Sequence, residues 1–205
     1  ILLGMSDAQA QEAMENTIAS LAQQIADPYS RAKDIKAWLM PPAGSTQPRV
    51  SEIPKRVLLY RTLGKIGDDS SLHLLRSALG DSDSAIQDAA VRALAEWPNS
   101  TARDDLLDIA RKSKDATHQV LALRGFIRMI GLEKYQSPEA AVRNLRTALE
   151  LASRPEEKRR VLGALPDFAC LEALALAESL LTVEEVREEA RAAINKIREH
   201  LERKD

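Results

Sequence analysis

One hydrophobic register recurs along the chain and constrains its fold more than any other feature. A large apolar residue returns at intervals of about 33 residues, near the end of every second expected helix. These anchor positions are Ile66, Trp97, Ile130, Leu165 and Ile197. The positions three residues before the anchors are aliphatic, and those four residues before are small or apolar. The first set consists of Leu63, Leu94, Ile127, Leu162 and Ile194. The second set consists of Thr62, Ala93, Phe126, Val161 and Ala193. This spacing predicts stacked helix pairs that bury one another's apolar stripes.

Composition favours an all-helical chain. Ala and Leu dominate the sequence, and both lose little conformational freedom in a helix. Only 8 of the 205 residues are Gly. No segment alternates apolar and polar residues for long enough to predict a strand. We expect helices at about 6–26, 28–40, 52–66, 70–79, 84–97, 101–113, 116–131, 138–152, 155–165, 168–181 and 183–202.

Start signals mark several of these helices. Capping-box patterns are formed by Ser6 with Gln9, Ser84 with Gln87, Ser153 with Glu156, and Thr182 with Glu185. An N-cap residue followed by proline occurs at Asp27-Pro28 and at Ser137-Pro138. The proline-rich stretch that begins at Pro41 predicts an irregular loop over 41–50. We therefore expect one all-α domain over 1–205, a right-handed α-α superhelix of about five helix pairs plus an N-terminal helix.

Three consecutive segments resemble a known repeat family. Residues 63–68, 72–81 and 86–94 resemble HEAT-like repeats of the phycobilisome-lyase type, and the resemblance is clear over 50–131. The valine-arginine pair that usually opens the second helix is replaced by Ile86-Gln87. The resemblance implies a protein-contact module within a multidomain bacterial protein, many of which are exported, and it supplies no catalytic residue. Because the sequence begins at Ile1 without an initiator Met, we expect a piece of a longer protein.

Several classes of function lack support in the sequence. The formal net charge of −2 gives no overall attraction to nucleic acid or anionic membrane. No apolar run is long enough to span a membrane. The only cysteine, Cys170, and the histidines His73, His118 and His200 form no metal-ligand pattern. Cys170 opens an expected helix, whose N-terminus would lower the pKa of the thiol, although burial as a small apolar residue explains it as well. We expect no cofactor, metal or small-molecule ligand.

The arginines are the sharpest candidates for an interaction surface. Arg92, Arg124, Arg159 and Arg191 lie five or six residues before an anchor, and Arg128 extends the set. Such a stripe on the second helices would line a concave surface and bind an acidic peptide, because guanidinium groups form bidentate bonds to carboxylates. The alternative is a neutralised ladder, because acids stand at helical spacing. These pairs are Asp88 with Arg92, Glu156 with Arg159 and Arg160, and Glu188 with Arg191.

Arg124 and Arg128 differ from the rest because Leu121 occupies the position where an acid would pair with Arg124. A half-buried guanidinium needs a partner, so we expect ion pairs between repeats, with Asp88 or Glu156 as the acid. Trp38, beside the proline-rich loop, is the aromatic candidate for a ligand contact.

These observations predict a non-catalytic helical-repeat module that presents a concave surface to a protein partner or to a neighbouring domain. Two alternatives remain at this stage. One is a small enzyme or nucleic-acid-acting module on the same scaffold, and the other is a purely structural spacer.

Overall fold

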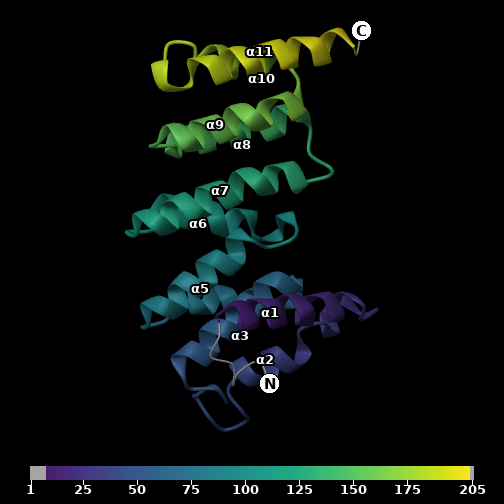
Figure 1. Ribbon diagram of the computed structural model, residues 1–205, viewed down its shortest axis with the longest axis vertical. Helices are drawn as coiled ribbons and strands as arrows, with labels where there is room; N and C mark the ends of the chain where they lie inside the picture. Colours follow the sequence, from purple (N-terminus) through teal and green to yellow (C-terminus); the bar gives the residue numbers. More distant parts are fainter. Residues whose placement is uncertain (1–7, 204–205) are drawn as a thin grey trace. The chain divides into compact units, whose positions relative to one another are not determined.

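The computed structural model describes residues 8–203, and within that range the chain is helical with no strand (Figure 1). No helix in this range is long and apolar enough to cross a membrane. The chain divides after Asp105 into two compact units, which are described separately. We call them unit 1 and unit 2 in chain order.

Unit 1 is built around helix α3. Its helices are α1 (Ala8–Gln23), α2 (Lys33–Leu39), α3 (Ile53–Ile66), α4 (Leu72–Ala78) and α5 (Ser84–Ala95). Short 3₁₀ turns precede several helices: η2 (Pro28–Ser30), η3 (Asp69–Ser71) and η4 (Ser100–Ala102). Helix α3 contacts α1, α2 and α5, while α4 contacts α5. The helices that carry the register, α3 and α5, therefore pack directly on each other, and α1 continues this layer.

Unit 2 repeats the arrangement with longer helices. Helix α6 (Arg103–Lys112) begins before the boundary, and it is followed by α7 (Ala116–Leu132), α8 (Pro138–Leu151), α9 (Pro155–Ala164), η5 (Leu165–Phe168), α10 (Leu171–Glu178), η6 (Glu184–Val186) and α11 (Arg187–Glu202). Helix α9 contacts both α7 and α11, and α8 contacts both α7 and α10. Two layers result, one of α7, α9 and α11 and one of α8 and α10.

The predicted hydrophobic register forms the core. Every anchor, and every position three or four residues before an anchor, is buried. Trp97 and Leu165 lie just beyond the ends of α5 and α9, and both are buried. The predicted all-α repeat fold is confirmed. A single right-handed superhelix through 1–205 stays a prediction.

Helix starts agree with the sequence only in part. Ser137 caps α8 as predicted, because its side chain accepts a hydrogen bond from the amide of Ala140. The N-cap of α5 is Asp83 rather than Ser84, since the Asp83 carboxylate already accepts from the amide of Ala85. The Asp27 side chain caps only the 3₁₀ turn η2, so α2 begins later than expected.

Two further predicted capping boxes are wrong. Helix α9 has Arg154 at its N-cap, one residue beyond Ser153, and Pro155 opens the helix without a side-chain cap. The turn η6 has Val183 rather than Thr182 at its N-cap. The Ser6 pattern lies outside the described residues. No helix covers residues 41–50, the range of the expected irregular loop.

A glycine sets the distance between α3 and α5. A β-carbon built on Gly64 would lie 2.7 Å from Cα of Ala93, which is closer than side-chain carbons pack. The two backbones approach so closely only because Gly64 has no side chain. Helix α3 then ends at Gly67, whose φ of 65° is left-handed and whose amide donates to the carbonyl of Leu63.

Candidate functional site

A charged groove lies over the contact between α3 and α5 in unit 1. It has a volume of about 390 Å³ and is lined by Glu12, Arg61, Lys65, Asp88, Arg92, Ala93 and Glu96. We call it the α1/α3/α5 groove. The α3 cations stand four residues apart, and Asp88 and Arg92 of α5 and Glu96 at its C-cap also follow at intervals of four. Each row therefore lies along one face of its helix. Ala93 is the only uncharged residue in the lining.

The cations of the groove are held by carboxylates. Glu15, which is fully buried on α1, places Oε2 2.8 Å from Nζ of Lys65 and 3.3 Å from Nη2 of Arg61. Lys65 also donates to the side-chain oxygen of Asn16 at 2.9 Å. On α5, Nε of Arg92 donates to Oδ2 of Asp88 at 2.7 Å, and this hydrogen bond raises the pKa of the guanidinium. Arg61, Lys65 and Arg92 are thus fixed, charged and paired.

Glu12 and Glu96 differ from the groove cations in their exposure and pairing. Both are exposed, and among residues 8–203 neither carboxylate forms an ion pair within 4.0 Å, although the charge of Glu96 does contribute to the raised pKa of Arg92. Together with Asp88 and the underlying Glu15 they make four carboxylates against three cations. The groove therefore carries a small excess of negative charge.

The arginines of unit 2 form a regular ladder between helices. Nη2 of Arg124 on α7 lies 2.9 Å from Oε1 of Glu157 on α9. Nε of Arg159 on α9 lies 2.8 Å from Oε1 of Glu189 on α11. In both pairs an arginine six residues before one anchor contacts a glutamate eight residues before the next anchor. The structure thus pairs Arg124 across repeats, but with Glu157 rather than with the predicted Asp88 or Glu156.

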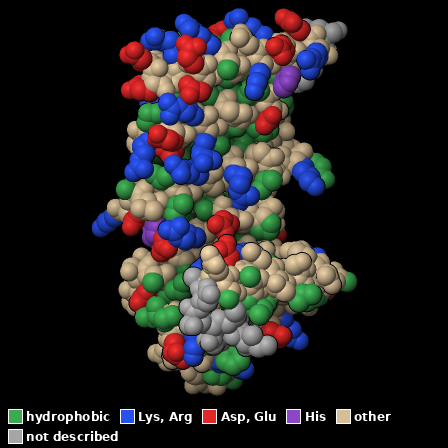
Figure 2. Space-filling view, viewed as in Figure 1, with side chains coloured by type: hydrophobic (Ala, Val, Ile, Leu, Met, Phe, Trp, Pro, Cys, Tyr) green, Lys and Arg blue, Asp and Glu red, His purple; other side chains and the backbone are tan. Residues whose placement is uncertain are grey.

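Other candidate arginines lie on exposed surface. Arg191 pairs with Glu188 one turn earlier on α11, at 2.8 Å, and Arg159 also lies 3.9 Å from Glu156. Arg128 is exposed on α7. On the face shown in Figure 2, basic and acidic side chains are interspersed over the region of α7 to α11. The neutralised-ladder interpretation therefore describes these arginines better than a free basic stripe does.

Trp38 does not belong to the groove. Half of its surface is exposed on α2, and its carbonyl oxygen accepts a hydrogen bond from the amide of Val50, which ties the end of the proline-rich loop to α2. Of the residues proposed from the sequence, the structure brings only Arg92 into the groove lining.

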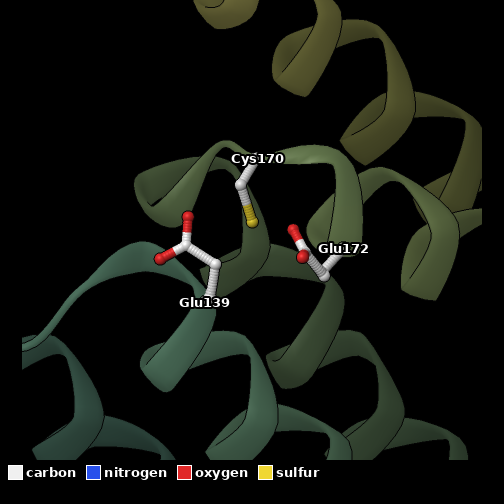
Figure 3. Close-up of side chains that lie close together, drawn as sticks. All are labelled: Glu139, Cys170 and Glu172. Carbon is white, nitrogen blue, oxygen red and sulfur yellow. The ribbon is translucent and has the colours of Figure 1, made fainter.

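A second cluster lies in unit 2, where Glu139, Cys170 and Glu172 point toward one another (Figure 3). Their potential ligand atoms lie within 4.8 Å of each other. Burial raises the pKa of the Cys170 thiol, and the neighbouring Glu172 raises it further. This corrects the expectation that the helix N-terminus lowers the pKa. Because a metal binds the thiolate, the raised pKa of the thiol weakens this cluster as a metal site, and both glutamates lie in first helical turns, where negative charge is stabilising.

The buried acids are the residues that the sequence interpretation missed. Glu157 stands eight residues before the Leu165 anchor, a position occupied by Leu58, Ala89 and Ala122 in the earlier repeats. That alignment marks Glu157 as an inward-facing charge. Glu15 shares its helix face with the buried Ala19 and Ala22, so helical spacing would have identified it too.

The comparison with protein families agrees with a helical-repeat architecture. Residues 51–124, from the start of α3 into α7, match the family of HEAT repeats. Among solved structures, the chain is similar to the crystal structure of an engineered protein, a target of the Northeast Structural Genomics Consortium. The two share 20% sequence identity with a TM-score of 0.45, over 97% of this chain and 94% of that chain. No curated protein matches the sequence. The phycobilisome-lyase subtype stays a prediction, whereas residues 51–124 match HEAT repeats within an all-α chain of packed helix pairs.

Proposed function

We propose that this chain is a non-catalytic protein-interaction module and that the α1/α3/α5 groove is its partner-binding surface. HEAT repeats generally mediate protein interactions or scaffolding. The observation that carries the proposal is a groove lined almost entirely by charged side chains, whose cations are already held by carboxylates. Charged groups that are fixed before binding lose little conformational entropy when a partner arrives.

The chemistry of the lining favours recognition over catalysis. The groove lining consists of carboxylates, cations and one alanine, and it contains no Ser, Thr or Cys nucleophile and no His base. Charges of both signs on a shared surface select partners by electrostatic complementarity and speed their association. A protein surface with matching charges is therefore the expected ligand.

A charge swap tests the proposal. In the groove variant, Arg92→Glu is combined with Glu96→Arg. This leaves the net charge unchanged but exchanges the positive and negative charges at the C-terminal end of α5. The matched control exchanges the exposed pair of α11, as Glu188→Arg with Arg191→Glu. Affinity capture followed by quantitative mass spectrometry is done with both variants and the unmodified chain.

We expect at least one protein to be retained by the unmodified chain and by the control but lost by the groove variant. Identical captured sets for all three, or no specific partner for any, would contradict the proposal and favour a structural spacer.

A further inference from the structure

We infer that the segment received by the α1/α3/α5 groove is basic, with lysine or arginine side chains bound beside Glu12 and Glu96. This inference rests on the proposed function and names the chemistry of the partner. It is opposite to one of the two interpretations of the arginines in the sequence, the one in which they bind an acidic peptide.

The groove cations are poorly available to an acidic ligand. Arg61 and Lys65 share the carboxylate of Glu15, which is fully buried. If an acidic ligand drew both cations away, the buried charge of Glu15 would lose its compensation at a large energetic cost. The side-chain oxygen Oε1 of Glu15 already has no hydrogen-bond partner among the described residues, so this carboxylate has no alternative donor there.

The third groove cation is also occupied. Arg92 donates to Asp88 at 2.7 Å within α5. A carboxylate from a partner would have to replace Asp88 or share its guanidinium group while lying near both Asp88 and Glu96. Like charges placed together at an interface are unfavourable.

The groove acids, by contrast, are available. Glu12 on α1 and Glu96 on α5 are exposed, and within residues 8–203 neither has an ion-pair partner. Glu12 lies in α1 and Glu96 at the C-cap of α5, and both of these helices contact α3. An ammonium or guanidinium group gains attraction to either carboxylate without separating an existing pair. With four carboxylates and three cations, the groove as a whole also favours a positive ligand.

Peptide probes of opposite charge test the inference. Fluorescence anisotropy is measured with the full chain and two short alanine-based peptides, one carrying lysines and the other glutamates at the same positions. The lysine peptide should bind more tightly, and its affinity should fall as salt is raised. Combining Glu12→Gln with Glu96→Gln should weaken its binding about fivefold, because two exposed ion pairs are lost.

The matched control combines Glu184→Gln with Glu185→Gln, which removes the same charge from exposed positions in η6. It should leave the affinity for the lysine peptide unchanged. Equal or tighter binding of the glutamate peptide would overturn the inference. So would equal losses in the two glutamine variants, or no binding of either peptide.

The charge-swap experiment separates this failure from failure of the proposed function. If the groove swap still loses its captured partner, the groove is a binding surface and only the preference for basic segments is wrong. If the swap loses no partner, both proposals fall.

Discussion

At the scale of single residues, Glu157 in unit 2 is a buried carboxylate that depends on a single cation. Its surface is 1% exposed, Oε1 accepts two hydrogen bonds from Arg124, and Oε2 has no partner among the described residues. A buried carboxylate with so few donors depends strongly on its one cation. Arg159 and Glu189 form the equivalent pair one repeat later, but each side chain is 42% exposed. Water can solvate that second pair when it breaks.

Removal of the two arginines should therefore have unequal effects. We expect Arg124→Ala to lower the free energy of unfolding by about 2 kcal/mol, because it leaves a buried charge uncompensated. Arg159→Ala should cost less than about 1 kcal/mol, as is usual for an exposed pair. Urea unfolding followed by circular dichroism measures both. Adding Glu157→Gln to Arg124→Ala should recover part of the loss, and equal losses for the two arginine variants would refute the argument.

Asp68 in unit 1 gives stability a dependence on pH. Burial raises the pKa of Asp68, but hydrogen bonds from Ser70 and Lys36 outweigh it, so the pKa lies below its ordinary value of 3.8. A carboxylate whose pKa is lowered by folding contributes fully above its ordinary pKa, and the contribution is lost as pH falls toward the folded pKa.

The difference in unfolding free energy between the natural chain and Asp68→Asn should then be constant from neutral pH to about pH 5 and shrink below pH 3.8. Near neutral pH we expect a loss of about 1–3 kcal/mol, because Lys36 would lose its buried anionic partner. Asp104→Asn, at a position whose side chain is 87% exposed, serves as the control with little change at any pH. A constant difference between the natural chain and Asp68→Asn down to pH 3 would show that this carboxylate does not supply the effect.

Residue partners were the hardest feature to predict. The register predicted that Arg124 pairs with a neighbouring repeat, yet it gave Asp88 or Glu156 rather than Glu157 as the acid. Neighbouring residues on a helix differ by about 100° in direction, so a small error in the rotation of α9 exchanges an inward glutamate for an outward one. Only the packed position of α9 settles which of them is buried.

At the scale of elements, helix interiors followed the sequence, whereas helix starts followed it only in part. Short 3₁₀ turns precede α4, α6 and α11, and they move the start of each α-helix a few residues beyond the capping signal. A cap residue satisfies the same free amides in either kind of turn. Sequence therefore locates the turn but does not distinguish its geometry.

The α3–α5 contact depends on Gly64, whose added β-carbon would lie 2.7 Å from Cα of Ala93. Gly64→Ala should lower the free energy of unfolding by about 1–2 kcal/mol, because the energetic cost of forcing α3 and α5 apart exceeds the gain from the better helix propensity of alanine. Gly163 in α9 has nothing within 4 Å of the equivalent position. Gly163→Ala should instead stabilise by about 0.5 kcal/mol. Urea unfolding measures whether each substitution raises or lowers the free energy of unfolding. Stabilisation by both would mean that α3 and α5 move apart without an energetic cost.

At the scale of the whole molecule, the repeat fold was predictable because one period places the anchors, and the residues three and four positions before them, in the core. The groove was not, because it depends on α1, which precedes the first anchor and has no counterpart in the register. Glu12 and Glu15 acquire their roles only when α1 packs on α3. Arg92 and its partner Asp88 were found from the sequence for their spacing on one helix, while Glu12 and Glu15 come from α1.

The distribution of charge over the chain leads to a last prediction. The sequence has 29 basic and 31 acidic residues, and most of the arginines singled out from the sequence are paired with carboxylates in the structure. Binding to duplex DNA releases counterions only where cations are free to contact phosphates. We therefore expect no measurable binding of a labelled DNA duplex at about 0.15 M salt, and no more than weak binding when salt is lowered. Anisotropy over a salt series is the measurement. Binding that falls steeply with salt would reveal a basic surface and restore the nucleic-acid alternative.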